Sequence, residues 1–285
     1  MIGKDSDGCM IFSAKSKTFL LGEYAVLWGG SAIVLITEPE FQLIVEKNAG
    51  NSYQLDGIDE GSPAFLFFTQ HRDTFQNLRL RFCDPHNGSG GFGASSAQYV
   101  LLHQLYRQLT YSPWNIKQFL DEYRKHCRQS VKPSGADCIA QQENQHVYFN
   151  SASNHVEHLN WNFDDLDFAI LKTGIKVKTH VHLQQLHRMD VADLNNIVEK
   201  VRESFGDGNS SLLIKNISIF SHLLTEKKLV MDEICHLVSQ LLKIKGVLAA
   251  KGCGALSADT IIVIFDKRDR ENILNFCKNL NLKNS

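Results

Sequence analysis

A stretch rich in glycine and serine, GSGGFGASSAQ at residues 88–98, constrains the fold of this chain more than any other feature of its sequence. It follows the alternating segment LRLRFCD, a pattern typical of a strand. From Ala97 onward, apolar residues recur at intervals of four, as they do on one face of a helix. The stretch therefore predicts a loop that leads from a strand into a helix beginning near Ala94. Its glycines also spell G-x-G-x-x-G from Gly88, the fingerprint of a dinucleotide-binding turn.

The dinucleotide-binding interpretation fails on its context. It needs an acidic residue about 20 positions beyond the glycines to hold a ribose hydroxyl, and no Asp or Glu occurs between Pro85 and Leu120. A P-loop of the form G-x-x-x-x-G-K-[ST] is also absent from the sequence. What remains is a helix N-terminus whose unpaired N–H groups favour phosphate, with the hydroxyls of Ser95 and Ser96 beside them. The alternative is simple capping, with one of these serines as the N-cap.

The bulk composition excludes several classes of protein. With 30 Lys and Arg residues against 31 Asp and Glu residues, the formal net charge is -1, which argues against a broad nucleic-acid-binding or membrane-binding surface. The beginning of the chain lacks the apolar core of a signal peptide, and no apolar run approaches the roughly 20 residues that span a bilayer. The seven cysteines are scattered and form no C-x-x-C pair, a pattern typical of reduced thiols. We therefore expect a cytoplasmic protein.

The order of the expected elements indicates an α+β protein rather than a sheet built from repeated βαβ units. Residues 41–47 are expected to pair with 52–57, a segment that contains the turn dipeptide Asp56-Gly57. A soft boundary near residue 165 gives two domains, 1–165 and 166–285. We expect strands at 9–24, 31–38, 41–47, 52–57, 78–84, 167–174, 246–252 and 259–266, and helices from 94, at 112–127, from 134, and at 192–205, 231–243 and 271–280.

Four segments resemble, in order and spacing, the motifs of one kinase superfamily. They are SAKSKTFLLGEYAVLWGGSAIVL at 13–35, GGFGASSAQ at 90–98, KPSGADCIAQ at 132–141 and KGCGALSAD at 251–259. The first resembles P-G-K-x-x-L-x-G-E-[HY]-A-V-x-x-G, the second G-L-G-S-S-A, the third S-G-x-D and the last K-x-x-G-A-G-G-G. These motifs are those of the GHMP kinases, named for galactokinase, homoserine kinase, mevalonate kinase and phosphomevalonate kinase. The resemblance implies an N-terminal domain like domain 2 of ribosomal protein S5 and a ferredoxin-like C-terminal domain.

The resemblance also implies an ATP site at two glycine loops. In the superfamily the first loop wraps the ATP phosphates from a helix N-terminus, and Ser95 falls where the family has a Mg²⁺-ligating serine. The last loop approaches the nucleotide, but here Leu256, Ser257 and Ala258 replace most of its terminal glycines, which restricts the backbone. The implied ATP-binding residues are Gly91, Phe92, Gly93, Ala94, Ser95, Ser96, Gly254 and Ala255.

Catalytic residues follow from the same resemblance. Lys17 matches the lysine of the opening motif, which would activate the acceptor hydroxyl and balance charge on the moving phosphoryl group; the alternative is a solvated strand lysine. Asp137 matches the aspartate of S-G-x-D, the proposed general base, although Ser134 and Asp137 also spell an S-x-x-D capping box. Glu23, Tyr24 and Ser134 are assigned to substrate binding, and the alternative for Glu23 and Tyr24 is that they anchor a turn.

The expected metal site departs from the family. Mevalonate kinases carry a Mg²⁺-binding glutamate eight positions before the S-G-x-D serine, and that position is His126 here. A neutral imidazole is a poorer ligand for Mg²⁺ than a carboxylate. Either Glu122, one helical turn earlier, replaces the glutamate, or the ion is held by ATP, Ser95 and water. The opening motif departs too, with Lys15-Ser16 in place of Pro-Gly.

Together these features predict an ATP- and Mg²⁺-dependent kinase that phosphorylates a small carboxylic acid in the mevalonate route to isoprenoids. Mevalonate is the first expected acceptor and phosphomevalonate the alternative. A different class is a degenerate member of the fold that binds a small molecule or a partner without chemistry. Lys172, Lys176 and Lys178 resemble a region of mevalonate kinases and either reach an anionic substrate or lie solvated. A homodimer is compatible with the sequence. The sequence does not specify the oligomeric state, the molecule that is phosphorylated or any feedback regulation.

Overall fold

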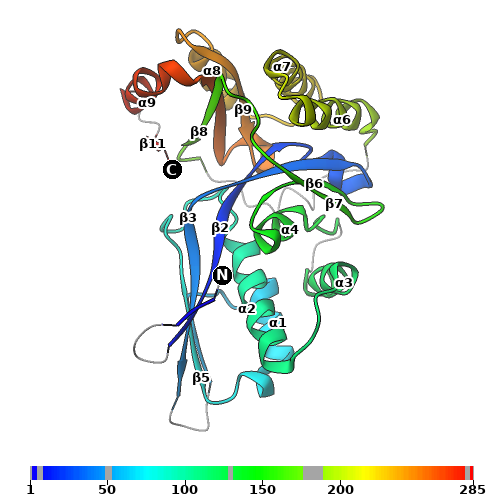
Figure 1. The fold of residues 1–285 in the computed structure, drawn as a ribbon, viewed down its shortest axis with the longest axis vertical. Coiled ribbons are helices and arrows are strands. Elements are labelled where there is room, and N and C mark those ends of the chain that lie inside the picture. The colour runs from blue at the N-terminus through cyan, green and yellow to red at the C-terminus, as the bar shows by residue number, and fades with distance from the viewer. Residues whose placement is uncertain are drawn as a thin grey trace. The chain divides into compact units, whose positions relative to one another are not determined.

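The structure is a computed structural model that describes residues 2–4, 9–48, 53–127, 131–175, 189–279 and 283–284 (Figure 1). It combines helices with antiparallel sheets, so the predicted α+β class is confirmed. Within the described residues, no helix is both long and apolar enough to cross a membrane. The predicted domains 1–165 and 166–285 stay a prediction, because the chain forms compact units from several segments each. Unit 1 comprises Met1–Lys17, Ile36–Gly88 and Phe92–Asn144, and unit 2 comprises Thr18–Leu35, Ser89–Gly91 and Gln145–Ser285.

A seven-stranded sheet has the path β1-β2-β3-β5-β4, with β6 paired to β3 and β7 paired to β6. The hairpin expected between 41–47 and 52–57 is wrong, because residues 42–47 pair with β5 and β4 joins β5 in parallel. Gly57 does turn the chain, with φ of 80°, but the chain then enters a helix instead of returning as a neighbouring strand. The strands are β1 (Ile2–Lys4), β2 (Met10–Leu21), β3 (Ser31–Lys47), β4 (Gln54–Asp56) and β5 (Leu78–Cys83).

Strand β3 is continuous where the sequence suggested two strands. Its residues 31–34 pair with β6 (His146–Asn150), and its residues 42–47 pair with β5. Pro39 lies between these two paired segments, where its missing N–H breaks neither of these ladders.

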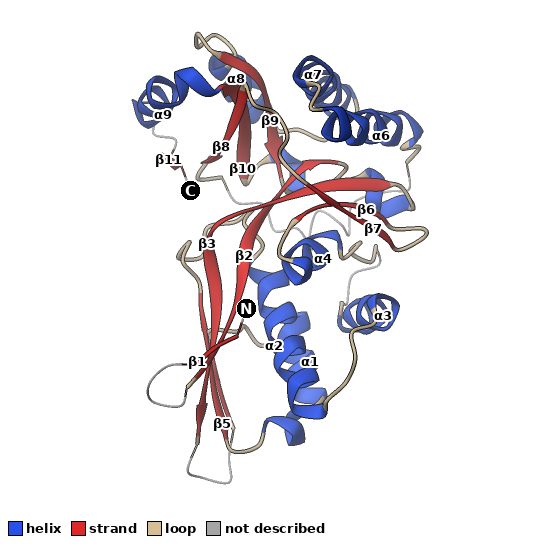
Figure 2. Cartoon of the chain, viewed as in Figure 1, coloured by secondary structure: helices blue, strands red, loops and turns tan. Residues whose placement is uncertain are grey.

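The helices of unit 1 lie together along one face of its sheet (Figure 2). Their starts follow from local capping, since Ser62 Oγ accepts a hydrogen bond from Phe65 N (3.1 Å) and Asn115 Oδ1 accepts one from Gln118 N (2.9 Å). Because Asn115 is the cap, the helix expected from residue 112 begins four residues later. The helices are α1 (Pro63–Gln70), η2 (Arg72–Phe75), α2 (Ala94–Thr110), α3 (Ile116–His126) and α4 (Ala136–Glu143).

Unit 2 contains a four-stranded antiparallel sheet in the order β11-β8-β10-β9. Its strand β10 is fully buried from Thr260 to Phe265. A strand covered on both faces needs no polar side, which explains the continuous apolar run TIIVIF. The elements are β8 (Leu166–Lys172), β9 (Val247–Cys253), β10 (Thr260–Asp266), β11 (Lys283–Asn284), α8 (Asp232–Leu241), α9 (Arg270–Asn279), η3 (Ala255–Ser257) and η4 (Lys267–Asp269).

Two further helices of unit 2, α6 (Ala192–Asp207) and α7 (Ser210–Glu226), form an antiparallel pair (Figure 1). Gly208 ends α6 with φ of 62°, and Asn209 Oδ1 caps α7 by accepting a hydrogen bond from Leu212 N (3.0 Å). Helix α7 packs against β9, and α6 packs against the short helix η1 (Ala25–Trp28). Strand β6 pairs with β7 (His155–Leu159) beside the start of β3. Residues 18–35 of the opening motif therefore belong to the same unit as the final loop.

Candidate functional site

In unit 1, the glycine-rich loop leads into α2 with its N-terminal amides available. Gly93 is the N-cap, with φ of 89°, and no described side chain caps the helix. The predicted alternative of a serine N-cap is therefore wrong, because Ser96 is buried and its hydroxyl donates to Gly93 O (2.9 Å). Ser95 is exposed at the same helix end. The first-turn N–H groups of α2 and the positive end of its dipole are thus free to bind phosphate.

Lys17 lies against this loop. Its backbone N–H donates to Phe92 O (2.9 Å), and its side chain is nearly buried. A Cβ added to Gly93 would lie 2.8 Å from both Cγ and Cε of Lys17, so the lysine stem fills the space that the glycine leaves. Gln141 of α4 donates from Nε2 to Lys15 O (2.9 Å) and to Gly93 O (3.2 Å). The loop, β2 and α4 are thereby tied together around Lys17, and the interpretation of Lys17 as a solvated strand lysine is wrong.

Asp137 lies in the first turn of α4, where the S-x-x-D capping box does not form. The N-cap is Gly135, with φ of 84°, and Ser134 Oγ accepts from Ala136 N (3.2 Å) instead of from Asp137. Asp137 Oδ1 accepts from Cys138 N (3.0 Å). Ser134 itself is buried, and its carbonyl accepts a hydrogen bond from Arg124 (2.9 Å). Asp137 therefore accepts one first-turn N–H of α4, but the S-x-x-D capping box with Ser134 is not formed.

The buried thiol of Cys138 reports on the charges of Lys17 and Asp137. Burial raises the pKa of Cys138 well above its ordinary value, the Asp137 carboxylate adds to the rise, and the Lys17 ammonium opposes it. Cys138 is wholly buried and protonated at neutral pH, which agrees with the predicted role of a small core residue rather than a nucleophile.

The two residues considered as metal ligands in α3 both contact the C-terminal end of α1, one through Gln70 and the other through His71, which follows the helix. Glu122 Oε1 lies 3.0 Å from His71 Nε2, and His126 Nε2 lies 3.1 Å from Gln70 Oε1. Burial lowers the pKa of His126, so its ring is neutral at pH 7. Among the described residues, no group of three His, Cys, Asp or Glu side chains forms a metal site. The exposed hydroxyl of Ser95 at the start of α2 is an oxygen donor of the kind that Mg²⁺ prefers.

In unit 2, Glu23 of the opening motif forms a buried ion pair. Glu23 Oε1 lies 2.7 Å from Lys251 Nζ, and the two side chains are 7% and 0% exposed. Burial opposes the charged form of Lys251, but its neighbours Cys253 and Glu23 outweigh that effect and raise its pKa. The Phe220 ring lies below the ammonium at 5.7 Å. The second carboxylate oxygen of Glu23 is buried without a hydrogen-bond partner among the described residues.

Tyr24 contacts the final loop from the same side. Its hydroxyl accepts a hydrogen bond from Leu256 N (3.2 Å), and burial raises its pKa far above the ordinary value, which keeps it neutral. Leu256 and Ser257 have φ of 50° and 57°, a left-handed conformation that costs a residue other than glycine about 1–2 kcal/mol. Hydrogen bonds from Ser257 N to Gly254 O (3.0 Å) and from Met231 N to Leu256 O (3.2 Å) help to hold the loop.

Asp259 is the residue that sequence reasoning missed. A Cβ on Gly90 would lie 2.6 Å from Asp259 Oδ1, and a Cβ on Gly254 would lie 2.3 Å from Oδ2. Gly91, with φ of 88°, approaches the same side chain. Gly90 and Gly254 therefore leave room for the Asp259 carboxylate, and Gly91 leaves room for its Cβ; Gly91 and Gly254 are predicted ATP-binding residues. The sequence feature that could have identified Asp259 is its place as the acidic residue at the end of KGCGALSAD. The glycines of that segment leave room for its buried side chain.

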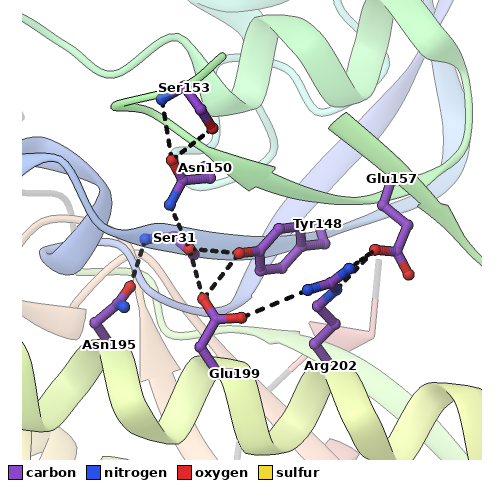
Figure 3. Close-up of polar contacts among 8 residues, drawn as sticks. All are labelled: Ser31, Tyr148, Asn150, Ser153, Glu157, Asn195, Glu199 and Arg202. Atoms are coloured by element: carbon purple, nitrogen blue, oxygen red, sulfur yellow. Dashed lines mark hydrogen bonds and ion pairs between the residues drawn. The ribbon is translucent and has the colours of Figure 1, made fainter. Parts of the chain in front are cut away.

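The opening motif is fixed at its other end by a polar network on α6 (Figure 3). Ser31 N donates to Asn195 Oδ1 (2.7 Å), and Ser31 Oγ and Tyr148 OH both donate to Glu199 Oε1 (2.8 Å each). Arg202 stacks over the Tyr148 ring at 4.5 Å. Ser31 is fully buried, so these bonds replace the water that its polar groups lose.

The predicted site residues thus form one group in each unit. In unit 1 the structure brings Lys17, the start of α2 and α4 together, and in unit 2 it joins the opening motif to the final loop. Lys176 and Lys178 lie outside the described residues. The group of unit 1 contains Lys17, Phe92, Gly93, Ala94, Ser95, Ser96, Ser134 and Asp137, and that of unit 2 contains Glu23, Tyr24, Gly91, Gly254 and Ala255.

Solved structures with a similar fold identify the fold class of the chain. No protein-family model and no curated protein sequence matches the chain. The phosphomevalonate kinase of Streptococcus pneumoniae, in complex with phosphomevalonate and AMPPNP, is 14% identical with a TM-score of 0.77, over 96% of this chain and 98% of that chain. The mevalonate kinase of Methanococcus jannaschii is 12% identical with a TM-score of 0.76, over 99% and 98%. The galactokinase of Lactococcus lactis, complexed with galactose, is 11% identical with a TM-score of 0.76, over 99% and 93%.

The chain has the fold of the GHMP kinases, which confirms the resemblance of its motifs at the level of the fold. The expected α+β architecture of two domains, one like domain 2 of ribosomal protein S5 and one ferredoxin-like, fits this fold. Identities of 11–14% carry the comparison no further than the fold.

Proposed function

We propose that the protein is an ATP-dependent small-molecule kinase. The observation that supports this proposal most is the grouping in unit 1, where nearly buried Lys17 lies against Gly93 at the uncapped start of α2. Helix N–H groups and a fixed ammonium are suited to a triphosphate. Asp137 on the adjoining α4 adds the carboxylate that a hydroxyl acceptor needs. The degenerate, non-catalytic member of the fold is disfavoured because both charged groups are present, and Lys17 is nearly buried against the loop.

In the proposed reaction, the acceptor oxygen forms a bond to the γ-phosphorus as the bond to ADP breaks. Asp137 takes the hydroxyl proton, and Lys17 stabilises the negative charge on the transferring group. The α2 amides hold the remaining phosphates. Mg²⁺ bound with the nucleotide would neutralise phosphate charge, and Ser95 is the protein group that would hold it.

Mevalonate is the proposed acceptor, and phosphomevalonate is the second candidate. Both alternatives are represented among the similar folds, since one solved neighbour is a mevalonate kinase and another holds phosphomevalonate with AMPPNP. Measuring ADP release with Mg²⁺-ATP and each compound separates them. Activity on phosphomevalonate alone would overturn the first choice. Absence of both ATP binding and turnover across a broad acceptor panel would establish the non-catalytic alternative. A cytoplasmic location and a homodimer stay predictions.

Replacing the proposed base tests the mechanism directly. Asp137→Asn keeps the shape of the side chain but removes its ability to accept a proton, so kcat should fall by about 100-fold or more. The KM for ATP should change little. Asp121→Asn, on the exposed face of α3, is the matched control and should keep full activity. A kcat for Asp137→Asn within threefold of the unmodified enzyme would remove Asp137 from the mechanism.

A further inference from the structure

Glu23 and Tyr24 of the opening motif contact the final loop and the strand that leads into it. The sequence predicts that this loop binds the nucleotide. We propose that these two residues are positioning residues that set the conformation of the loop at 254–258, and that they do not bind the acceptor. The kinetic part of this inference rests on the proposed kinase function. The structural part concerns only contacts within unit 2.

Tyr24 holds the part of the loop that is hardest to form. Leu256 lies in the left-handed region, with φ of 50° and ψ of 29°, where a leucine does not rest without support. Its N–H donates to the Tyr24 hydroxyl at 3.2 Å, and the Tyr24 side chain is 3% exposed. A neutral, buried hydroxyl in this position is engaged with the loop backbone. Because the side chain is 3% exposed, it offers almost no surface to a bound acceptor.

Glu23 acts on the strand that leads into the same loop. Lys251 lies in β9, three residues before Gly254, and its ammonium is fully buried against Glu23 at 2.7 Å. Cys253 follows in the same strand, and its thiol donates to Phe19 O at 3.2 Å. Because Lys251 has no exposed surface, its charge serves the Glu23 pair and is not presented to phosphate. The end of β9 is therefore fastened to the opening motif at two points.

The opening motif can position the loop because it is itself held by close packing and hydrogen bonds. A Cβ on Gly22, with φ of 91°, would lie 2.3 Å from Ser31 O, and one on Gly30 would lie 2.7 Å from Asn195 Oδ1. Ser31 is held by Asn195 and Glu199 of α6 (Figure 3). The segment from Gly22 to Ser31 is thus clamped on α6 at one end and contacts the final loop through Glu23 and Tyr24.

The Tyr24→Phe variant tests the proposal with a minimal change. It removes the oxygen that accepts from Leu256 N and keeps the ring. We expect faster hydrogen–deuterium exchange at residues 254–258 and a KM for ATP raised about fivefold, the equivalent of one neutral hydrogen bond. The KM for the acceptor should stay the same. Tyr99→Phe is the matched control, because the Tyr99 hydroxyl of unit 1 is also buried but has no hydrogen-bond partner among the described residues.

The outcomes separate the two roles and the two proposals. A raised acceptor KM with unchanged loop exchange and unchanged ATP KM would assign Tyr24 to the acceptor and overturn the inference. Loop exchange equal in Tyr24→Phe and Tyr99→Phe would overturn it as well. If the unmodified chain shows no kinase turnover, the proposed function fails, while the exchange measurement still decides the positioning role.

Discussion

At the scale of the residue, the buried pair of Glu23 and Lys251 makes a sharp prediction about stability. Glu23→Gln leaves the Lys251 ammonium buried without a counter-charge, so we expect the free energy of unfolding to fall by about 3–5 kcal/mol. Glu23→Gln with Lys251→Met removes both charges and keeps the packing volume, so most of the loss should be recovered. Urea denaturation of the three proteins measures this. A double variant no more stable than the single one would contradict a buried ion pair.

Single residues also show what the sequence could and could not reveal about the site. Lys17, Asp137 and the loop before α2 could be singled out because each lies in a motif with its own local chemistry. The contacts of Glu23 with Lys251 and of Asp259 with Gly90 could not, because each joins residues more than 150 positions apart. Spacing in a sequence carries no information about such pairs. The Asp259 carboxylate explains why position 90 is a glycine, since a Cβ there would lie 2.6 Å from Oδ1.

At the scale of the element, the sequence predicted most of the longer segments, but not all of them. Helix α2 begins at Ala94 as expected, and the strands near 246–252 and 259–266 are present as β9 and β10. Helix α1 was missed because PAFLFFTQ is a short apolar run whose periodicity does not separate a helix from a strand. Helix α7 and the hairpin of β6 and β7 were also not predicted. The pairing of β4 was wrong because strand order depends on the crossover through α1, which no local pattern specifies.

The start of α2 is the element on which the proposed site depends, and Gly93 tests it. Alanine at Gly93 would suffer both a left-handed φ of 89° and a Cβ 2.8 Å from the Lys17 stem. Gly61→Ala is the matched control, because Gly61 has φ of 83° but nothing within 4 Å of an added Cβ. Both variants should lose about 1 kcal/mol of stability from the backbone conformation. Only Gly93→Ala should also weaken ATP binding, by about tenfold or more, because Lys17 and the loop must move apart.

Calorimetric titration with ATP checks this prediction of a selective loss. If both Gly93→Ala and Gly61→Ala bind ATP as tightly as the unmodified protein, the contact between the loop and Lys17 does not shape the nucleotide site. An equal loss of affinity in both variants would assign the effect to general destabilisation instead.

At the scale of the whole molecule, the aromatic core of unit 1 links stability to pH. His103 of α2 is buried among the rings of Phe119 (4.7 Å) and Phe67 (5.7 Å). Burial, assisted by the charges of Arg107 and His71, lowers the pKa of His103 from 6.5 to about 3. Its Nδ1 has no hydrogen-bond partner among the described residues, so the neutral ring is held by packing. Neither its burial nor its neighbours were evident from the sequence, where His103 is one polar residue in a helix.

The sign of the resulting pH dependence follows from proton binding. Below pH 6.5 the unfolded chain protonates His103 and the folded chain does not, so stability is lost as the pH falls from 6.5 toward 3. At pH 5 this residue should cost about 2 kcal/mol relative to pH 7. His103→Leu should therefore reduce the difference in unfolding free energy between pH 7 and pH 5 by that amount, measured in urea. The exposed control His236→Gln should leave the difference unchanged. An equally steep pH dependence in His103→Leu would show that His103 is protonated alike in both states.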